Sequence, residues 1–172
     1  PSKEPTALDE VVDSVLHRMQ PVLGGVRVRT LLRDTPDVAA DPVQIDQVLS
    51  NLIENAVRFS ASGGEVVVST AAWHSSVQIR VVDHGPGIAP ADRERVFEAF
   101  ARVGASAPDE AGGSGLGLAI AKAIVEAHGG RIWIEGVPAG GTAVVMTIAI
   151  IASLVPAWRA AKIDPLKALR HQ

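Results

Sequence analysis

The sequence predicts an α+β domain in which a mixed β-sheet carries about three helices on one face. The predicted strands come in adjacent pairs with helices between the pairs, which differs from strict βαβ alternation. The chain has 172 residues, enough for one domain with a sizeable core, and 47% of them are hydrophobic, as is typical of globular proteins. We therefore expect a two-layer α/β sandwich with an additional C-terminal helical tail.

Apolar periodicity places the elements. Apolar residues at helical spacing predict helices over 7–19, 42–59, 91–100 (short) and 116–128. Alternating patterns predict strands over 26–32, 65–72, 77–83, 131–137 and 141–150. Asp41 is expected to cap the helix that opens at Pro42.

The connecting segments and one helix face carry further expectations. Residues 33–42 are predicted to be a loop that contains one short extended piece. Residues 101–115 lack periodicity and are rich in Gly, Ala and Ser, which indicates a mobile loop. In the helix over 116–128, Leu116, Ile120 and Ile124 share one register, and that line is expected to be the apolar face.

Composition excludes several classes of protein. Sixteen basic and 19 acidic residues give a net charge of −3, so no nucleic-acid partner is expected. The absence of cysteine excludes disulfides and thiolate metal sites. The first residues do not resemble a signal peptide, and their abrupt polar start suggests a cut from a longer chain. The apolar stretch 143–158 is shorter than the ~20 residues of a membrane helix, so a buried strand running into a helix is favoured.

Polar side chains form a line along the predicted helix over 42–59. Asn51, Asn55 and Arg58 are spaced i, i+4 and i+7, so they project from nearly one line, although asparagine is a mediocre helix former. Amide oxygens suit Mg²⁺, which also shares phosphate ligands, and Arg58 could meet a phosphate oxygen. Glu54 could orient a water or accept a proton. The alternative is an amphipathic helix whose polar side happens to be rich in amides.

A second candidate segment follows the predicted strand over 77–83. Asp83 ends that strand, and Gly85 and Gly87 come directly after it. A carboxylate there can accept a hydrogen bond from an exocyclic amine such as that of adenine, and glycines let a planar ring approach the backbone. The alternative is a plain Asp–Gly turn in which Asp83 bonds its own loop, and this segment alone slightly favours that alternative.

A third candidate segment is rich in glycine and opens the predicted helix over 116–128. Gly113, Gly115 and Gly117 supply bare N–H groups ahead of a helix N-terminus, which favours a phosphate, and Ser114 can add a hydroxyl. No strand directly precedes these glycines and their spacing fits a dinucleotide fingerprint only loosely. A P-loop is also disfavoured, because Lys122 lies one turn too far into the helix.

Four motifs occur in one order and together carry a family resemblance. They are "NLIENAVRF", "DHGPGI", "VFEAFARV" and "GGSGLGLAIAKAIVEAHGGRIWIE". They resemble the asparagine box, first glycine box, phenylalanine box and second glycine box of the ATP-binding catalytic domain of bacterial sensor histidine kinases. The superfamily also holds gyrase-type, heat-shock-chaperone and mismatch-repair ATPases. The resemblance covers about residues 5–148, and within the family the sequence is most similar to potassium-responsive sensor kinases.

The resemblance implies that ATP and Mg²⁺ are bound, and it assigns roles to individual residues. The implied metal ligands are Asn51 and Asn55, and the implied catalytic residues are Glu54, Asn55 and Arg58. Asp83 would bind the adenine amine, and residues 101–114 would form a lid over ATP, with Phe97 and Phe100 anchoring its base. The implied nucleotide-binding set is Asn51, Asn55, Arg58, Asp83, Gly85, Gly87, Ile88, Phe100, Arg102, Gly113, Ser114, Gly115, Leu116 and Gly117.

The implied reaction is transfer of the γ-phosphoryl group of ATP to a histidine, as part of two-component signalling. None of the chain's five histidines is followed by an acidic residue or lies upstream of the ATP-binding module. The acceptor is therefore expected on a separate dimerisation domain of the parent kinase, with a response regulator downstream. The chain would be the cytoplasmic portion of a membrane sensor kinase. The alternatives are a serine kinase of the anti-sigma type, a plain ATPase and a nucleotide-binding module without turnover.

The resemblance divides the chain into a catalytic domain over 1–148 and a tail over 149–172. The tail stretch "PAWRAAKIDPLKALR" resembles the cytoplasmic end of the last membrane helix in ABC-transporter permeases of the lipoprotein- and macrolide-export type. Pro156 and Pro165 would interrupt a long helix. The tail is basic and amphipathic, so it can contact a membrane or its own domain, and packing or partial disorder is favoured over membrane contact.

Overall fold

A computed structural model of the chain describes residues 2–101, 114–138 and 140–151. Within these residues the α-helices are α1 (Leu8–Met19), α2 (Pro42–Phe59) and α3 (Gly117–Ala127). The strands are β1 (Glu4–Thr6), β2 (Arg27–Leu31), β3 (Val38–Ala40), β4 (Glu65–Trp73), β5 (Ser76–Asp83), β6 (Arg131–Gly136) and β7 (Thr142–Ala149). Three short 3₁₀ turns are η1 (Gln20–Val22), η2 (Pro90–Asp92) and η3 (Arg95–Phe97).

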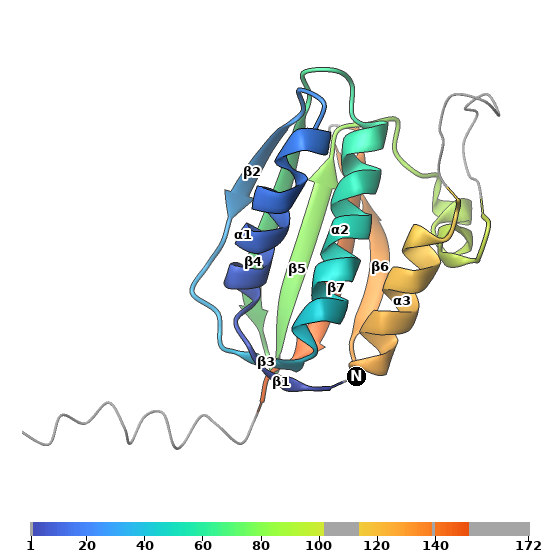
Figure 1. Cartoon of the computed structure of the whole chain (residues 1–172). Coiled ribbons are helices and arrows are strands. Elements are labelled where there is room, and N and C mark those ends of the chain that lie inside the picture. The colour runs from blue at the N-terminus through green and yellow to red at the C-terminus, as the bar shows by residue number, and fades with distance from the viewer. Residues whose placement is uncertain (1, 102–113, 139, 152–172) are drawn as a thin grey trace, which may run out of the picture.

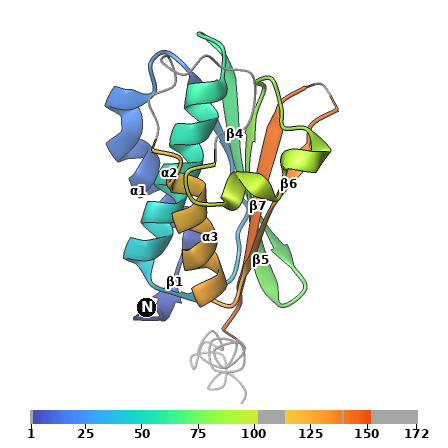
Figure 2. The ribbon, with the colours of Figure 1, turned by 90° about the vertical axis from the view of Figure 1, so that its right-hand side faces the viewer.

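The strands form one mixed sheet with the α-helices on one side of it. The order in the sheet is β2-β4-β5-β7-β6, in which β2 and β4 are parallel and the other neighbours antiparallel. Strands β1 and β3 pair separately at one end of the domain. Figure 1 shows α1, α2 and α3 side by side across the sheet, and Figure 2 shows the two layers edge-on. The predicted two-layer α/β sandwich is confirmed.

The predicted apolar faces of the first two helices form the core, but that of α3 is shifted. Leu49, Leu52, Ile53 and Ala56 of α2 are all buried, as are Leu8, Val12, Val15 and Met19 of α1. The predicted line of Leu116, Ile120 and Ile124 on α3 is only partly right, because Ile124 packs against the core but Ile120 does not. The fully buried residues of α3 are Ala121 and Val125, one position further along, and Ile120 is exposed.

Two local elements differ from the sequence-based expectation. Strand β1 was not predicted, because three residues show no periodicity and the strand exists only through its pairing with β3. The short helix expected over 91–100 is instead the pair of 3₁₀ turns η2 and η3. Their bonds run from residue i+3 to residue i, as in Glu98 N–H to the Arg95 carbonyl at 2.9 Å. The extended piece expected within 33–42 is β3.

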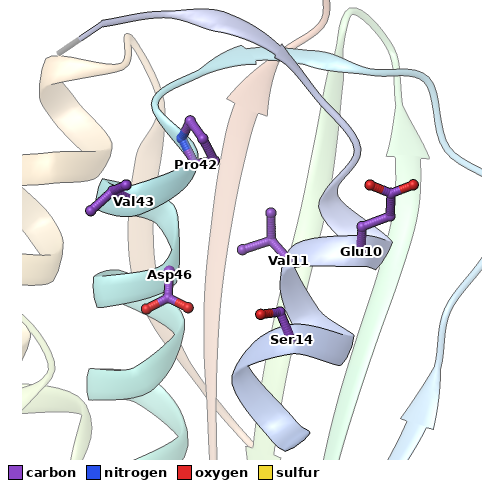
Figure 3. A pocket seen from close by; sticks show the side chains of 6 residues that line it. All are labelled: Glu10, Val11, Ser14, Pro42, Val43 and Asp46. Atoms are coloured by element: carbon purple, nitrogen blue, oxygen red, sulfur yellow. The ribbon is translucent and has the colours of Figure 1, made fainter. Parts of the chain in front are cut away.

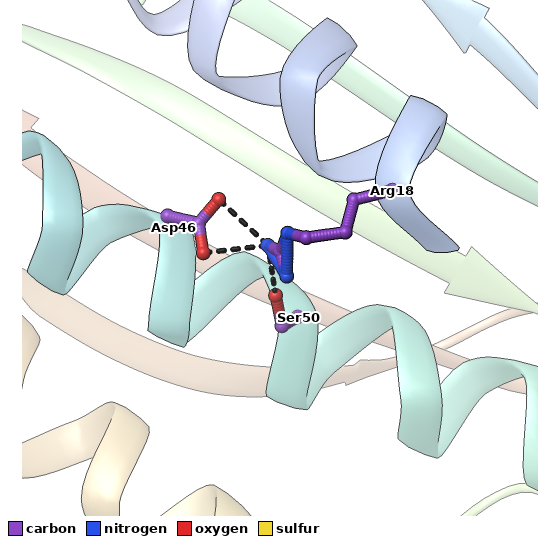
Figure 4. A network of polar contacts seen from close by, with 3 residues as sticks. All are labelled: Arg18, Asp46 and Ser50. Atoms are coloured by element: carbon purple, nitrogen blue, oxygen red, sulfur yellow. Dashed lines mark hydrogen bonds and ion pairs between the residues drawn. The ribbon is translucent and has the colours of Figure 1, made fainter. Parts of the chain in front are cut away.

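The start of α2 is fixed by its cap and by contacts with α1. The Asp41 carboxylate accepts from the N–H groups of Val43 and Gln44 at 3.1 and 3.2 Å, which confirms the predicted cap. Arg18 of α1 donates to both carboxylate oxygens of Asp46, at 2.6 and 2.7 Å, and to the Ser50 hydroxyl at 3.1 Å (Figure 4). The Arg18 side chain is largely exposed, so the pair contributes at most about 1 kcal/mol.

A buried histidine joins the end of α3 to the start of α2. The His128 Nε2 atom accepts from the Asp41 N–H at 3.0 Å, and Nδ1 lies 2.8 Å from the Ile124 carbonyl oxygen. Since a carbonyl only accepts and an N–H only donates, the ring is the neutral tautomer that carries its proton on Nδ1. His128 therefore holds α2 and α3 together at the end opposite to Gly117.

Replacing His128 with leucine is expected to lower the free energy of unfolding by about 1–3 kcal/mol, because the Asp41 N–H loses its acceptor in a partly buried position. Urea denaturation measures the loss. The matched control is His17→Leu at an exposed position of α1, for which no comparable loss is expected. Equal stability of the two variants would contradict the inference that His128 stabilises the packing of α2 against α3.

The apolar stretch 143–158 begins as a buried strand. Residues 143–146 and Ile148 of β7 are buried, in agreement with the strand part of the prediction, and residues 152–158 lie outside the described residues. Among the helices that the structure describes, none combines the length and apolar character required to cross a bilayer.

Candidate nucleotide site

Helix α2 brings the two glycine segments together. The Asn51 amide nitrogen donates to the Gly117 carbonyl at 3.1 Å, so the start of α3 lies against the middle of α2. Near the end of α2, Gly85 lies against the Phe59 carbonyl oxygen, which a Cβ at position 85 would approach to 2.5 Å. Eight residues of helix separate these contacts, about 12 Å at 1.5 Å per residue. Asn55 lies between them, so the three predicted segments converge on one helix.

Asp83 is held at the end of β5 by backbone donors. The residue is only 5% exposed, and its Oδ1 atom accepts from the Gly85 N–H at 2.8 Å and the Thr142 N–H at 3.3 Å. The Asp–Gly turn of the simpler alternative is therefore present, but it uses Oδ1 alone. Oδ2 accepts no hydrogen bond from any described residue, and no fully buried side-chain polar atom in the described part of the chain lacks a partner. Oδ2 thus remains accessible to a donor from outside the chain.

Burial changes the acid–base behaviour of this carboxylate. Desolvation raises the pKa of Asp83 above its usual value, while the two backbone N–H groups and nearby His84 act in the opposite direction. An acceptor that is fixed in place and poorly solvated binds a neutral amine donor with little reorganisation. This is the environment expected for a carboxylate that recognises a base edge.

Gly141 and Thr142 complete the surroundings of Asp83, and the sequence-based analysis did not select them. Gly141 is buried with φ +107°, and a Cβ there would overlap the Asp83 carbonyl oxygen. Gly87, with φ +79°, faces the Gly141 carbonyl, which a Cβ at 87 would approach to 3.1 Å. The dipeptide Gly140–Gly141 ahead of an apolar strand is typical of a turn. No pattern in the neighbouring sequence predicts its contact with Asp83.

The polar line of α2 fits Mg²⁺ only if phosphates supply further ligands. Because the amide nitrogen of Asn51 is engaged with Gly117, its amide oxygen is left as the coordinating atom. Asn55 is half-buried one turn further, and Glu54 and Arg58 are exposed. The described residues contain no cluster of three or more His, Cys, Asp or Glu side chains suited to a metal. Two amide oxygens plus substrate phosphates and water match the preference of Mg²⁺.

The N-terminus of α3 is prepared for an anion. The Ser114 hydroxyl accepts from the Leu116 N–H at 3.3 Å, and the Phe100 N–H donates to the Gly115 carbonyl at 3.0 Å. Gly115 has φ +69°, and a Cβ there would lie 2.9 Å from the Phe100 Cα atom, so the two backbones touch. The first turn of α3 therefore begins beside Asn51 of α2, and the N–H groups at a helix N-terminus favour an anion.

The two phenylalanines at the base of the predicted lid have different surroundings. Phe97 is buried, and the Lys122 Nζ atom lies 5.8 Å from its ring centroid. The Phe100 ring is 72% exposed and its φ is +64°, so Phe100 closes the base through its backbone bond to Gly115. Arg102, Gly113 and the rest of the predicted lid between them lie outside the described residues.

Two surface hollows in the described part of the chain lie near helices or turns of the domain, and neither is lined by Asn55 or Asp83. One, of about 360 Å³, lies between α1 and α2 (Figure 3). The other, of about 500 Å³, lies beside Gly87, Ile88 and the turn between β6 and β7. Ile88 also packs against the core. The second hollow thus borders the Asp83 turn, whereas the first is separate from the candidate site.

A buried carboxylate at a strand end, a helix that carries two asparagines and a glycine-rich helix start lie on one mixed α/β fold, an arrangement that suits a nucleotide. The sequence profile described as "Histidine kinase-, DNA gyrase B-, and HSP90-like ATPase" matches residues 40–150. The chain belongs to this family and carries its catalytic ATPase domain.

Named relatives within the family are sensor kinases. The sensor histidine kinase WalK of Bacillus subtilis is 42% identical over 123 residues, which cover 68% of this chain and 20% of WalK. The mycobacterial sensor histidine kinase MprB has a solved structure with 32% identity and a TM-score of 0.75, covering 86% of this chain and 97% of that one. Full-length ShkA in complex with AMPPNP has 30% identity and a TM-score of 0.74, covering 88% of this chain and 32% of ShkA.

Proposed function

We propose that the chain binds Mg²⁺-ATP and transfers the γ-phosphoryl group to a histidine on a separate phosphoacceptor domain. The observation that carries the proposal is Asp83, buried at a strand end with Oδ1 held by the backbone and Oδ2 left for an outside donor. The family of the chain supports ATP as the ligand, and a relative with 30% identity has been solved with AMPPNP.

In the proposal, different site residues contact the base and the phosphates of the nucleotide. Asp83 accepts from the exocyclic amine of adenine, in a pocket shaped by Gly85, Gly87 and Ile88. Arg58 contacts phosphate oxygens, and Arg102 and Phe100 belong to the lid side. The triphosphate is cradled by Gly113, Ser114, Gly115, Leu116 and Gly117 at the start of α3.

The proposed chemistry depends mainly on positioning and charge neutralisation. The bond between the γ-phosphorus and the bridging oxygen of ADP breaks, and a bond from the same phosphorus to an imidazole nitrogen forms. ADP leaves, and the imidazole loses its ring proton, for which Glu54 on the exposed side of α2 is the candidate acceptor. Asn51 and Asn55 would hold Mg²⁺, which neutralises phosphate charge.

The phosphoacceptor is proposed to act in trans. His17, His74 and His84 are exposed, but none precedes an acidic residue, and both ring nitrogens of His128 are engaged inside the fold. The chain covers 20% and 36% of two curated sensor kinases, which leaves room for such a domain in the parent protein. A response regulator would then receive the phosphoryl group.

The finer assignments of the parent remain part of the proposal. They comprise a potassium-responsive sensor, a cytoplasmic location, a catalytic domain bounded by residues 1–148 and a permease-like tail over 149–172. The four motifs support a catalytic domain within residues 1–148. The proposed tail over 149–172 lies almost wholly outside the described residues. Each assignment is tested by the sequence and phenotype of the intact parent gene.

Asn55→Ala is expected to lower phosphoryl transfer about 100-fold or more, because it removes a Mg²⁺ ligand beside the triphosphate. The chain is mixed with radiolabelled ATP, Mg²⁺ and a histidine-bearing helical hairpin from a related kinase. An acid-labile, alkali-stable label on the hairpin is the expected product. The control is Gln78→Ala on the opposite sheet face, which should retain activity.

The product distinguishes the rival functions. An acid-stable label on the acceptor would favour a serine kinase, and release of inorganic phosphate alone would favour an ATPase. Binding of ATP with neither product, using several hairpins, would leave a nucleotide-binding module. Full activity of Asn55→Ala would remove that residue from the metal site.

A further inference from the structure

A groove between α1 and α2 lies away from the proposed nucleotide site. It is an open groove of about 360 Å³, lined by Glu10, Val11 and Ser14 of α1 and Pro42, Val43 and Asp46 of α2 (Figure 3). Val43 is 76% exposed, and Val11 is only partly buried against the core. The groove thus contains apolar side chains that the described residues leave uncovered.

The rim of this groove is acidic. Asp46 is neutralised by Arg18, but Glu10 is exposed and forms no ion pair with any described residue. An occupant of the groove should therefore combine apolar side chains with positive charge.

The C-terminal segment of the same chain has this chemistry. Residues 156–170 contain four basic residues and one acidic residue, a net charge of +3, interspersed with large apolar side chains. These residues are Trp158, Ile163, Leu166 and Leu169, with Arg159, Lys162, Lys167 and Arg170. A lone basic amphipathic segment lowers its free energy by covering apolar surface beside acidic groups.

The segment leaves the fold close to the groove. Ile150 forms a bridge with Val38, and its N–H donates to the Ser75 carbonyl at 2.8 Å. Val38 lies only four residues before Pro42, at most about 14 Å along the chain. Trp158 lies eight residues after Ile150 and can extend roughly 26 Å from it. Trp158 can therefore reach the groove.

We propose that residues 156–170 dock into the groove between α1 and α2. Trp158 lies against Val11 and Pro42, and the basic side chains face Glu10. Since the segment is tethered, its effective concentration at the groove is on the order of millimolar, so a weak intrinsic affinity is sufficient. The proposal does not depend on nucleotide binding.

The absence of cysteine permits a direct test on the full chain. Ser14→Cys in the groove is combined with Ala161→Cys, and the effective concentration of the two thiols is measured by disulfide exchange with glutathione. The matched pair is Gln78→Cys with Ala161→Cys. Gln78 alternates with buried Val77 and Ile79 and pairs with Thr147, so it lies on the other sheet face, close to where the segment leaves β7.

The expected result is an effective concentration about tenfold or more higher for the groove pair than for the sheet pair. Glu10→Lys should lower the groove value toward the sheet value, because the rim would then repel the segment. Equal values for the two pairs would overturn the proposal. Binding of the segment to anionic vesicles, with no preference for the groove in their absence, would also overturn it.

Discussion

Replacing Asp83 with asparagine is expected to weaken ATP binding about 10- to 100-fold while the fold is retained. The loss corresponds to removal of a hydrogen bond to a charged acceptor, worth about 1.5–3 kcal/mol. Asparagine keeps an oxygen at the Oδ1 position for the Gly85 and Thr142 N–H groups, and it removes a charge that is costly to bury. The melting temperature of the ligand-free variant should therefore not fall.

Isothermal titration with ATP and with inorganic triphosphate separates base recognition from phosphate binding. The variant should lose affinity for ATP and keep its affinity for triphosphate. Asp92→Asn is the control, because Asp92 pairs with Arg95 on the surface. Equal losses for both ligands would remove Asp83 from the role of reading the base.

The raised pKa of Asp83 gives this prediction a pH dependence. Because the pKa of Asp83 is higher in the folded chain than in the unfolded chain, folding favours the protonated form. The stabilisation from this group is complete below the unfolded pKa and is lost as pH rises through the folded pKa. ATP affinity should change in the opposite direction and decrease as acidification protonates the carboxylate, and this decrease should be absent in Asp83→Asn.

Gly141→Ala is expected to disrupt both the domain and the site. The added Cβ would overlap the Asp83 carbonyl oxygen, and φ is +107°, a region that side-chain-bearing residues rarely adopt. Overpacking against backbone costs about 1–3 kcal/mol or more, to which the unfavourable φ adds about 1–2 kcal/mol. We expect an ATP affinity too low to measure and a melting temperature at least several degrees lower.

Gly140→Ala is the matched control for this experiment. Its φ is +89°, but a Cβ there meets no atom within 4 Å, so only the backbone term applies. Thermal unfolding and ATP titration of both variants measure the difference. If the two alanine variants lose equal stability and equal affinity, close packing of Gly141 on Asp83 is not what shapes the pocket.

Local patterns in the sequence were sufficient to predict the mixed sheet and the three α-helices, and to select three candidate segments that the fold brings near α2. Helix α2 is an example, because its cap at Asp41 and its apolar face at Leu49 and Leu52 are both properties of nearby residues. The polar line of Asn51 and Asn55 could be recognised for the same reason. Side-chain spacing on a helix is set by its geometry, whatever the helix packs against.

Features that depend on distant contacts could not be predicted. Strand β1 exists because it pairs with β3, and the buried face of α3 is set by the position of α2 and the sheet. Gly141 and Thr142 reach Asp83 only because β7 lies beside β5 in the sheet, and no local pattern specifies that neighbour. The 3₁₀ turns η2 and η3 likewise reflect the tertiary position of Phe97 and the preceding turn.

The hydrogen bond from the Phe100 N–H to the Gly115 carbonyl joins the two ends of the segment that lies between these residues. Because this bond fixes both ends of the segment, changes in its sequence or length should have little effect on the packing of α2 and α3. Lengthening a closed loop adds only about 0.6 kcal/mol per doubling. Insertions between the two residues should therefore cost little stability, whereas Gly115, whose φ is +69° and whose Cβ would meet the Phe100 backbone, should tolerate little variation.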